Sequence, residues 1–265
     1  MAMIIYSDID GTLISSQFQV TKKTKNAVRL ALSQGHFFVP VSARMPDAIV
    51  PIIDSIGIKT PIISYNGALI QLDDGKEIFS QPMTCQTAKS VCQKLESLSL
   101  EVVWNAYSGH SWYTQDKKNS WVRREEEIVM VKAKPLGIDE LSELPFVHKL
   151  LLMGDPEKIT RLEVELVKAF PNLSIVKSAP YFIEIMKSGI KKSQAVKYLS
   201  EYFEVAMTDT IAFGDNFNDF EMLKTVGQGY VMGNAPQEIK EKIGQVTSDN
   251  DHDGIAEILT KLLEK

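Results

Sequence analysis

Residues 3–13 read Met-Ile-Ile-Tyr-Ser-Asp-Ile-Asp-Gly-Thr-Leu, an apolar run that passes directly into two aspartates. The apolar, β-prone half predicts a buried strand. Because side chains alternate along an extended chain, we expect Asp8 and Asp10 to point to the same side. Carboxylates at the end of a buried strand are costly unless a cation compensates for them, and Gly11 permits a sharp turn after them. Taken alone, the same pattern also fits an Asx turn, so its meaning depends on the rest of the chain.

The composition is that of an ordinary globular protein, with 265 residues, 44% of them hydrophobic and 24% charged. The net charge is 29 − 34 = −5, without the basic stripe that nucleic-acid or anionic-membrane binding usually requires. No apolar run has transmembrane length, and no signal-peptide pattern is visible. Cys85 and Cys92 are seven residues apart on an expected helix, too far apart for a disulfide. We therefore expect a cytoplasmic protein with free thiols, without nucleic-acid or membrane partners, and a monomer or weak homo-oligomer.

Strand and helix patterns alternate at both ends of the chain, which predicts a parallel sheet with helices on its faces. The middle is different: it starts with a helical pattern and continues with short strands typical of an α+β region. We therefore predict an α/β fold with a Rossmann-like core over residues 1–82 and 188–265, and an inserted α+β cap domain over residues 83–187. In the core, we expect helices at 22–34, 46–57, 192–203, 236–243 and 255–263, strands at 37–41, 61–65, 208–213 and 229–232, and a hairpin around Asp73-Asp74-Gly75.

Polar clusters follow the predicted core strands at the points where these strands end. In open parallel sheets, ligands bind in the crevice at the carboxyl ends of the strands. Four clusters at such ends are hard to attribute to chance, and their coincidence is more informative than any single motif. They are Asp8/Asp10, Ser42/Arg44, Asn66/Gly67 and Asp215/Asn218/Asp219.

These clusters resemble, in order, the four motifs of the haloacid dehalogenase-like phosphatases. The matching residues are Asp8-Ile9-Asp10-Gly11-Thr12, Ser42, Lys192 and Gly214-Asp215-Asn216-Phe217-Asn218-Asp219. The insertion between the second and third motifs lies where the Cof-type, subclass IIB sugar phosphatases carry their cap. The second motif departs from the common Thr-Gly-Arg by reading Ser42-Ala43-Arg44. The third reads Gly189-Ile190-Lys191-Lys192-Ser193, so that Lys191 is an alternative to Lys192.

The resemblance implies that Asp8 is a nucleophile that forms an aspartyl-phosphate, and that Asp10 is the general acid and base. It also implies a Mg²⁺ ion bound by an Asp8 carboxylate oxygen, the Asp10 backbone carbonyl and Asp215. Gly11 and Thr12 belong to the same motif and would support this site.

For the phosphoryl group, the resemblance implies binding by Ser42 and Lys192, with Asn218 beside them. Asp219 would orient this group of residues by pairing with Lys192, although an aspartate there also suits a helix start. Three further interpretations stay open at this stage. Arg44 contacts either the substrate or a carboxylate, Asn66-Gly67 is either a turn or part of the site entrance, and residues 105–113 form either a solvated edge or a substrate-facing surface.

The sequence therefore predicts a Mg²⁺-dependent hydrolase of small phosphate monoesters, such as sugar phosphates. A phosphomutase with the same aspartate chemistry is an alternative that would need a cap able to exclude water. A non-catalytic regulator that binds metal and a phosphorylated ligand is a third possibility, disfavoured because Asp8 and Asp10 are both present. The sequence does not identify the substrate.

Overall fold

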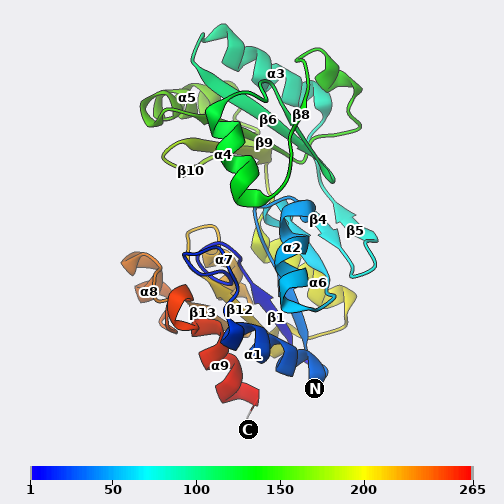
Figure 1. Ribbon diagram of the computed structural model, residues 1–265, viewed down its shortest axis with the longest axis vertical. Helices are drawn as coiled ribbons and strands as arrows, with labels where there is room; N and C mark the ends of the chain where they lie inside the picture. Colours follow the sequence, from blue (N-terminus) through cyan, green and yellow to red (C-terminus); the bar gives the residue numbers. More distant parts are fainter. Residues whose placement is uncertain (1, 264–265) are drawn as a thin grey trace. The chain divides into compact units, whose positions relative to one another are not determined.

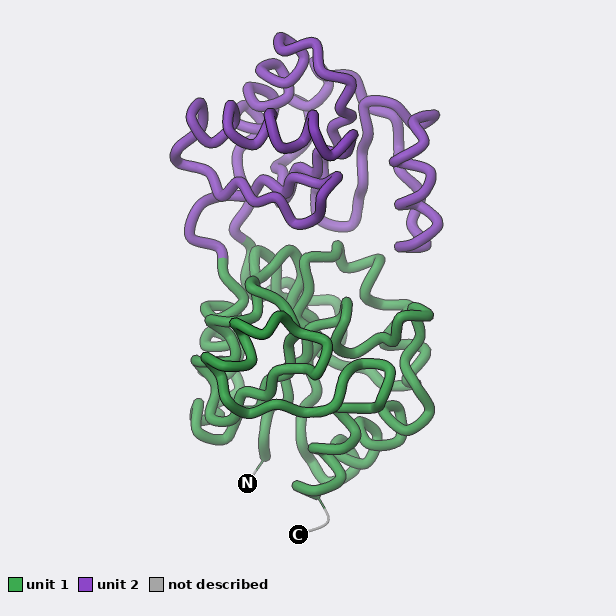
Figure 2. The backbone as a smooth tube through the Cα atoms, turned by 90° about the vertical axis from the view of Figure 1, so that its left-hand side faces the viewer, with its two compact units in different colours: residues 1–80, 191–265 green, residues 81–190 purple. Residues whose placement is uncertain are grey.

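The computed structural model describes residues 2–263, which form two compact units. Of the described residues, unit 1 comprises 2–80 and 191–263, and unit 2 comprises 81–190 (Figures 1 and 2). The chain thus leaves unit 1 after Ser80 and returns to it at Lys191. The boundaries expected from the sequence, after residue 82 and before residue 188, lie within a few residues of these points.

Unit 1 is built on a parallel sheet of four strands in the order β13-β12-β1-β2. Strand β1, one of the two inner strands, pairs with both of its neighbours, so that Tyr6 lies between Ala212 and Val39. Each strand is short and apolar, which suits a sheet that is covered on both faces. The strands are β1 (Ile4–Ser7), β2 (Phe37–Pro40), β12 (Thr210–Gly214) and β13 (Gln228–Val231).

Helices cover both faces of this sheet, because alternate strand residues belong to two separate apolar clusters. Ile5 and Phe213 pack with α1, α2 and α9, whereas Ile4 and Ala212 pack with α6, α7 and α8 (Figure 1). The helices are α1 (Lys22–Ser33), α2 (Pro46–Ile56), α6 (Lys192–Tyr202), α7 (Phe220–Thr225), α8 (Gln237–Ile243) and α9 (Gly254–Leu263). This confirms the predicted α/β, Rossmann-like architecture.

The third predicted strand departs from the expected sheet. Strand β3 (Ile62–Ser64) meets the end of β2 through a single parallel bridge between Val41 and Ile63. It then pairs antiparallel with β4 (Leu69–Gln71), which pairs with β5 (Glu77–Ser80). The predicted hairpin is therefore confirmed, but β3 belongs mainly to this small sheet, because its register with β4 satisfies its backbone groups.

Unit 2 has a sheet of six strands in the order β10-β11-β9-β6-β7-β8. The side chains of Trp104, Leu150 and Ile185 pack against helices α3 and α5 in one cluster, which is the core of this unit. The strands are β6 (Val102–Ser108), β7 (Ser111–Thr114), β8 (Lys134–Pro135), β9 (Lys149–Gly154), β10 (Leu173–Ala179) and β11 (Phe182–Lys187), and the helices are α3 (Cys85–Ser97), α4 (Ser120–Val129) and α5 (Pro156–Ala169).

Helix α4 was not predicted, although it contains the acidic run of residues 125–127. Asn119 caps its start, since the side-chain oxygen accepts a hydrogen bond from the Trp121 amide. Glu126 is buried and accepts hydrogen bonds from the Lys132 side chain and the Ala133 amide. Helix prediction from sequence depends on apolar residues that recur on one face. In α4 one buried position is taken by Glu126, which is paired with a backbone amide, so the apolar pattern is interrupted.

Two further features bear on the predictions from composition. Among residues 2–263, no helix combines the length and apolar character needed to cross a lipid bilayer. Cys85 and Cys92 are both free thiols, as predicted, and Cys92 is buried in the core of unit 2.

Candidate active site

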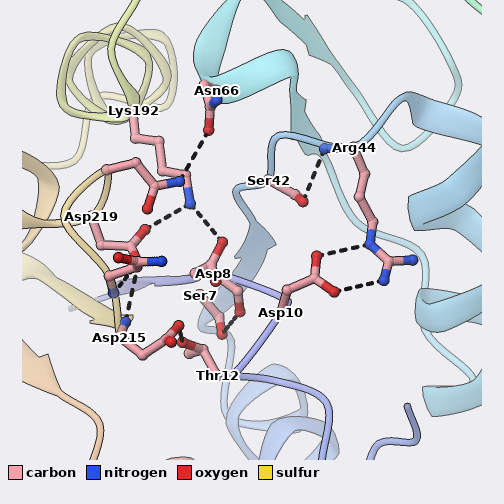
Figure 3. Close-up of polar contacts among 12 residues, drawn as sticks. Ser7, Asp8, Asp10, Thr12, Ser42, Arg44, Asn66, Lys192, Asp215 and Asp219 are labelled. Atoms are coloured by element: carbon pink, nitrogen blue, oxygen red, sulfur yellow. Dashed lines mark hydrogen bonds and ion pairs between the residues drawn. The ribbon is translucent and has the colours of Figure 1, made fainter. Parts of the chain in front are cut away.

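The ends of neighbouring strands in unit 1 are joined by backbone hydrogen bonds beyond the regular sheet. The Asp8 amide donates to the Phe213 carbonyl over 3.0 Å, which fixes the end of β1 beside that of β12. The Ser42 amide donates to Ile63 over 2.9 Å, and the Asn66 amide donates to Ser42 over 2.8 Å. The loops that follow β1, β2, β3 and β12 therefore meet at one edge, where Figure 3 shows their polar side chains converging.

Lys192 lies at the centre of this edge (Figure 3). Its Nζ atom donates to Oδ1 of Asp8 over 2.5 Å and to Oδ1 of Asp219 over 2.6 Å. The lysine is 2% exposed and Asp8 6% exposed, so these ion pairs are shielded from water. Lys191 precedes the first turn of α6 and is exposed, whereas Lys192 begins the helix and points inward. The structure thus places Lys192, and not Lys191, at Asp8.

Asp219 uses both of its carboxylate oxygens within the site. While Oδ1 accepts from Lys192, Oδ2 accepts from the amides of Asp215 and Asn216 over 3.1 and 3.0 Å. The loop after β12 is thereby folded around the carboxylate. A Cβ atom at Gly214 would lie 2.5 Å from that of Asp219, so this close packing requires glycine.

Asp215 faces the loop that follows Asp10. Its Oδ1 atom accepts a hydrogen bond from the Thr12 hydroxyl over 2.8 Å. Gly11 has φ of +78°, and a Cβ atom there would lie 2.5 Å from the Asp215 carboxylate. Glycine is therefore needed at residue 11 both for the left-handed turn and for the approach of Asp215. Asn234 donates to the Gly11 carbonyl over 2.9 Å and so holds the same turn.

Burial and mutual repulsion disfavour the charged forms of the carboxyl groups at this site. Burial raises the pKa of Asp8 well above its ordinary value; Asp219 adds to this rise and Lys192 opposes it. Burial likewise raises the pKa of Asp215 to about 6, against the effect of the Thr12 hydrogen bond. Burial alone would lower the pKa of Lys192, but its pairs with Asp219 and Asp8 outweigh this effect and raise it. The lysine is therefore a permanent cation.

This charge pattern fits a divalent cation. Oxygens of Asp8, Asp215 and Asp219 lie within 4.8 Å of one another. With all three ionised, and with one lysine, the local charge is −3 + 1 = −2, which Mg²⁺ would cancel. Asp219 is fully buried, and its two oxygens accept three hydrogen bonds over 2.6, 3.1 and 3.0 Å. Asp215 accepts one short hydrogen bond, from Thr12 over 2.8 Å, and a long one from Asn234 over 3.4 Å, so Asp8 and Asp215 are the carboxylates better placed to bind a metal.

Asp10 does not lie as the strand alternation predicted. Strand β1 ends at Ser7, so Asp8 and Asp10 are not on a continuous extended segment. The side chain of Asp10 is 51% exposed and is held by Arg44, whose Nε and Nη2 atoms donate to its two oxygens over 2.9 and 2.6 Å (Figure 3). Of the two interpretations left open for Arg44, the structure thus shows contact with a carboxylate.

The other predicted residues lie around this centre. The Ser42 hydroxyl is buried and accepts from the Arg44 amide over 3.1 Å, which leaves its hydrogen to donate. Asn218 is exposed, and its amide group donates to the Asn66 side chain over 3.4 Å, a long contact. Asn66 has φ of +53°, within the tight turn at residues 65–67. At Gly67 a Cβ atom would lie 2.9 Å from the Lys191 carbonyl, so glycine lets this turn approach the start of α6.

Two residues of this edge were not among the predicted ones. Asn234 holds the Gly11 turn, and the Ser7 hydroxyl donates to the Asp8 carbonyl over 2.7 Å. Asn234 follows strand β13, so the same strand-end argument applied to Gly233-Asn234 would have identified it. For Ser7 the sequence offers no comparable signal, because a serine inside a strand has no fixed partner.

The comparisons with known proteins agree with this fold. The model of the haloacid dehalogenase-like hydrolases matches residues 5–259. The chain therefore belongs to the haloacid dehalogenase-like hydrolase family, which confirms the resemblance seen in its motifs. A Haemophilus influenzae protein named "Putative phosphatase" is 36% identical over 98% of this chain and 97% of its own length.

Solved structures extend the similarity to three dimensions. A haloacid dehalogenase-like hydrolase from Bacteroides thetaiotaomicron has a TM-score of 0.91 and 26% identity, and the match covers 99% of this chain and 100% of that chain. A sugar phosphatase of haloacid dehalogenase subclass IIB shares the fold, with a TM-score of 0.83 and 22% identity over 98% of this chain and 99% of that one. The similarity thus covers both units of the chain.

Proposed function

We propose that this hydrolase is a Mg²⁺-dependent phosphatase of small phosphate monoesters, with sugar phosphates as the first class to test. The observation that carries the proposal is the buried Asp8 carboxylate, held by Lys192 and Asp219 next to Asp215. A carboxylate fixed in this way is preorganised to attack phosphorus, and the lysine beside it offsets charge on the phosphoryl group. The name of the Haemophilus influenzae relative supports the same reaction class.

The proposed reaction has two halves. Asp8 attacks phosphorus, the bond to the ester oxygen breaks, and Asp10 gives its proton to the departing alcohol. Asp10 then takes a proton from water as that water attacks the aspartyl-phosphate, which releases inorganic phosphate and restores Asp8. Lys192, Ser42 and Asn218 would hold the phosphoryl oxygens during both steps.

The metal would be bound by Asp8, Asp215 and the backbone carbonyl of Asp10. When bound, Mg²⁺ would offset the negative charge that these carboxylates bring to the incoming phosphate. Thr12 and Asn234 would keep the Asp215 carboxylate and the Gly11 turn in position for it.

The first test is phosphate release from a panel of phosphorylated metabolites that includes hexose phosphates, measured with Mg²⁺ and with EDTA. We expect phosphate release in Mg²⁺, a rate at least about 100-fold lower in EDTA, and recovery of the rate when Mg²⁺ is added back. A loss of about 100-fold is the scale of one electrostatic contribution removed from an active site. Release that is unchanged by EDTA would contradict the metal assignment. Conversion of a hexose phosphate to its isomer without phosphate release would instead indicate a phosphomutase.

We further propose that unit 2 is a cap that recognises the organic part of the substrate. The side chains of Trp104, Leu150 and Ile185 point into the apolar core of this unit. Because side chains alternate along strands, the opposite face of the same sheet carries the next residues in each strand, among them Lys149 and Glu184. Their charged atoms lie 3.6 Å apart, and Lys149 Nζ lies 5.0 Å from the centre of the Tyr107 ring. An aromatic ring beside buried donors and acceptors suits a hydroxylated ligand.

Replacement of Lys149 by methionine tests this proposal. We expect about a 10-fold or larger rise in KM for the preferred sugar phosphate, which is the scale of one charged hydrogen bond, and less than about a 3-fold change in kcat/KM for p-nitrophenyl phosphate. The control is Lys158→Met, which removes a lysine at the surface of the same unit. Equal losses on both esters would contradict a role in recognition.

A further inference from the structure

The Asp10 carboxylate forms a bidentate salt bridge with the Arg44 guanidinium group. Both carboxylate oxygens accept hydrogen bonds from the guanidinium group, over 2.9 and 2.6 Å. The arginine side chain is only 11% exposed, although Asp10 itself is 51% exposed. Such a bidentate pair fixes the plane of the carboxylate as well as its position.

Arg44 is itself held at its backbone. Its amide donates to the Ser42 hydroxyl over 3.1 Å, and its carbonyl accepts from the Tyr65 amide over 3.1 Å. The guanidinium group therefore extends from a fixed point at the end of β2 towards the loop that follows β1 (Figure 3). Asp10, by contrast, lies on the turn after β1 with its side chain half exposed, and both of its carboxylate oxygens accept from Arg44.

This contact has a consequence for an acid–base residue. An ionised carboxylate offers two equivalent acceptor oxygens in one plane, which matches the two parallel N–H groups of a guanidinium, whereas a protonated carboxyl also has a hydrogen to donate. A general acid has to carry a proton before it can give one to the departing alcohol. The two-point contact with Arg44 thus suits the carboxylate that remains after the proton has passed to the alcohol.

We propose that Arg44 is a positioning residue that receives and orients the Asp10 carboxylate once the proton has passed to the leaving group. In the first half-reaction the proton moves from Asp10 to the ester oxygen as the phosphorus–oxygen bond breaks, and the new carboxylate takes the two N–H groups of Arg44. In the second half-reaction a proton from water returns to Asp10, and one of these hydrogen bonds is released. This inference rests on the proposed role of Asp10.

The test compares esters that differ in their need for a proton. p-Nitrophenolate leaves phosphorus without protonation, whereas an alkoxide from a hexose phosphate does not. The quantity measured is kcat/KM, because it reports the first half-reaction alone when transfer to Asp8 is irreversible. For Arg44→Met we expect kcat/KM to fall about 10- to 100-fold on the hexose phosphate, which is part of the contribution that a general acid usually makes. On p-nitrophenyl phosphate we expect kcat/KM to fall less than about 3-fold, because its leaving group needs no proton.

Two further variants make the result decisive. Asp10→Asn should show the same dependence on the leaving group, and the double variant Arg44→Met/Asp10→Asn should lose no more than Asp10→Asn alone, because both changes remove one function. Arg44→Lys keeps the positive charge but cannot form the bidentate contact, so it should recover only part of the kcat/KM lost in Arg44→Met. It also serves if the methionine variant does not fold.

The outcomes separate the two proposals. Equal losses on both esters in Arg44→Met, or additive losses in the double variant, would overturn the positioning role and indicate that Arg44 contacts the phosphoryl group. If Asp10→Asn itself lost activity equally on both esters, the assignment of Asp10 as general acid would be wrong, and the role of Arg44 would be wrong with it. The Mg²⁺-dependent release of phosphate would still stand in either case.

Discussion

Asp8→Asn is expected to abolish phosphate release while the protein stays folded. An amide cannot serve as the attacking carboxylate, so the aspartyl-phosphate does not form. The substitution also removes a buried carboxyl whose pKa is raised by burial, and Lys192 keeps its pair with Asp219 over 2.6 Å. Because the ionised form of Asp8 is disfavoured inside the protein, its loss should cost little stability.

The measurement is turnover of the best substrate in saturating Mg²⁺, together with thermal unfolding of the same sample. Asp54→Asn is a suitable control, because it makes the same chemical change at an exposed position of helix α2. A variant with a tenth of the wild-type rate would show that Asp8 is not the nucleophile. A variant that unfolds at much lower temperature would leave Asp8 with a structural role that its contacts do not indicate.

Lys192→Ala is expected to lower both the rate and the stability. The rate should fall by about 10²–10³, the scale of one lost electrostatic donor in an active site. Stability should fall by about 3–5 kcal/mol, because removal of one partner leaves buried charges without compensation. Both Asp8 and Asp219 would lose their hydrogen bond to Nζ, at 2.5 and 2.6 Å in the structure.

The loss of stability should depend on pH in a defined direction. Burial raises the pKa of Asp8 above its ordinary value, and Lys192 opposes this rise. Without the lysine, the folded state binds a proton at Asp8 more readily than the unfolded state does, so stability falls as the pH rises. The destabilisation of Lys192→Ala relative to the wild type should therefore be larger at pH 8 than at pH 5 when both are measured without Mg²⁺.

The control for this variant is the adjacent lysine. Lys191→Ala removes an exposed side chain one residue away and should change the rate and the stability only slightly. Denaturant unfolding at both pH values and steady-state kinetics on one substrate give the comparison. A larger loss of activity in Lys191→Ala than in Lys192→Ala would mean that the positioning of the lysines in solution differs from that in the structure.

The sequence alone was sufficient for the architecture and for most of the residues that the structure brings together at one edge of the sheet. Strand β1, helix α1 from Lys22 and the hairpin of β4 and β5 follow from hydrophobic periodicity and turn residues, which are properties of short segments. The polar residues at strand ends could be grouped because parallel strands bring their carboxyl ends to one edge. The family follows from the same residues, and the comparisons confirm it.

Only the tertiary structure decided which of these residues meet. The choice of Lys192 over Lys191 depends on where helix α6 begins, and a shift of one residue on a helix turns a side chain by about 100°. The pair between Arg44 and Asp10 joins residues 34 positions apart, and Asn234 reaches Gly11 across 223 positions. Such contacts leave no local pattern, because they depend on how separate loops are placed by the packed sheet. The sequence by itself thus determined most of the elements and the chemistry available, whereas the packing of the sheet and helices decided the geometry in which that chemistry is arranged.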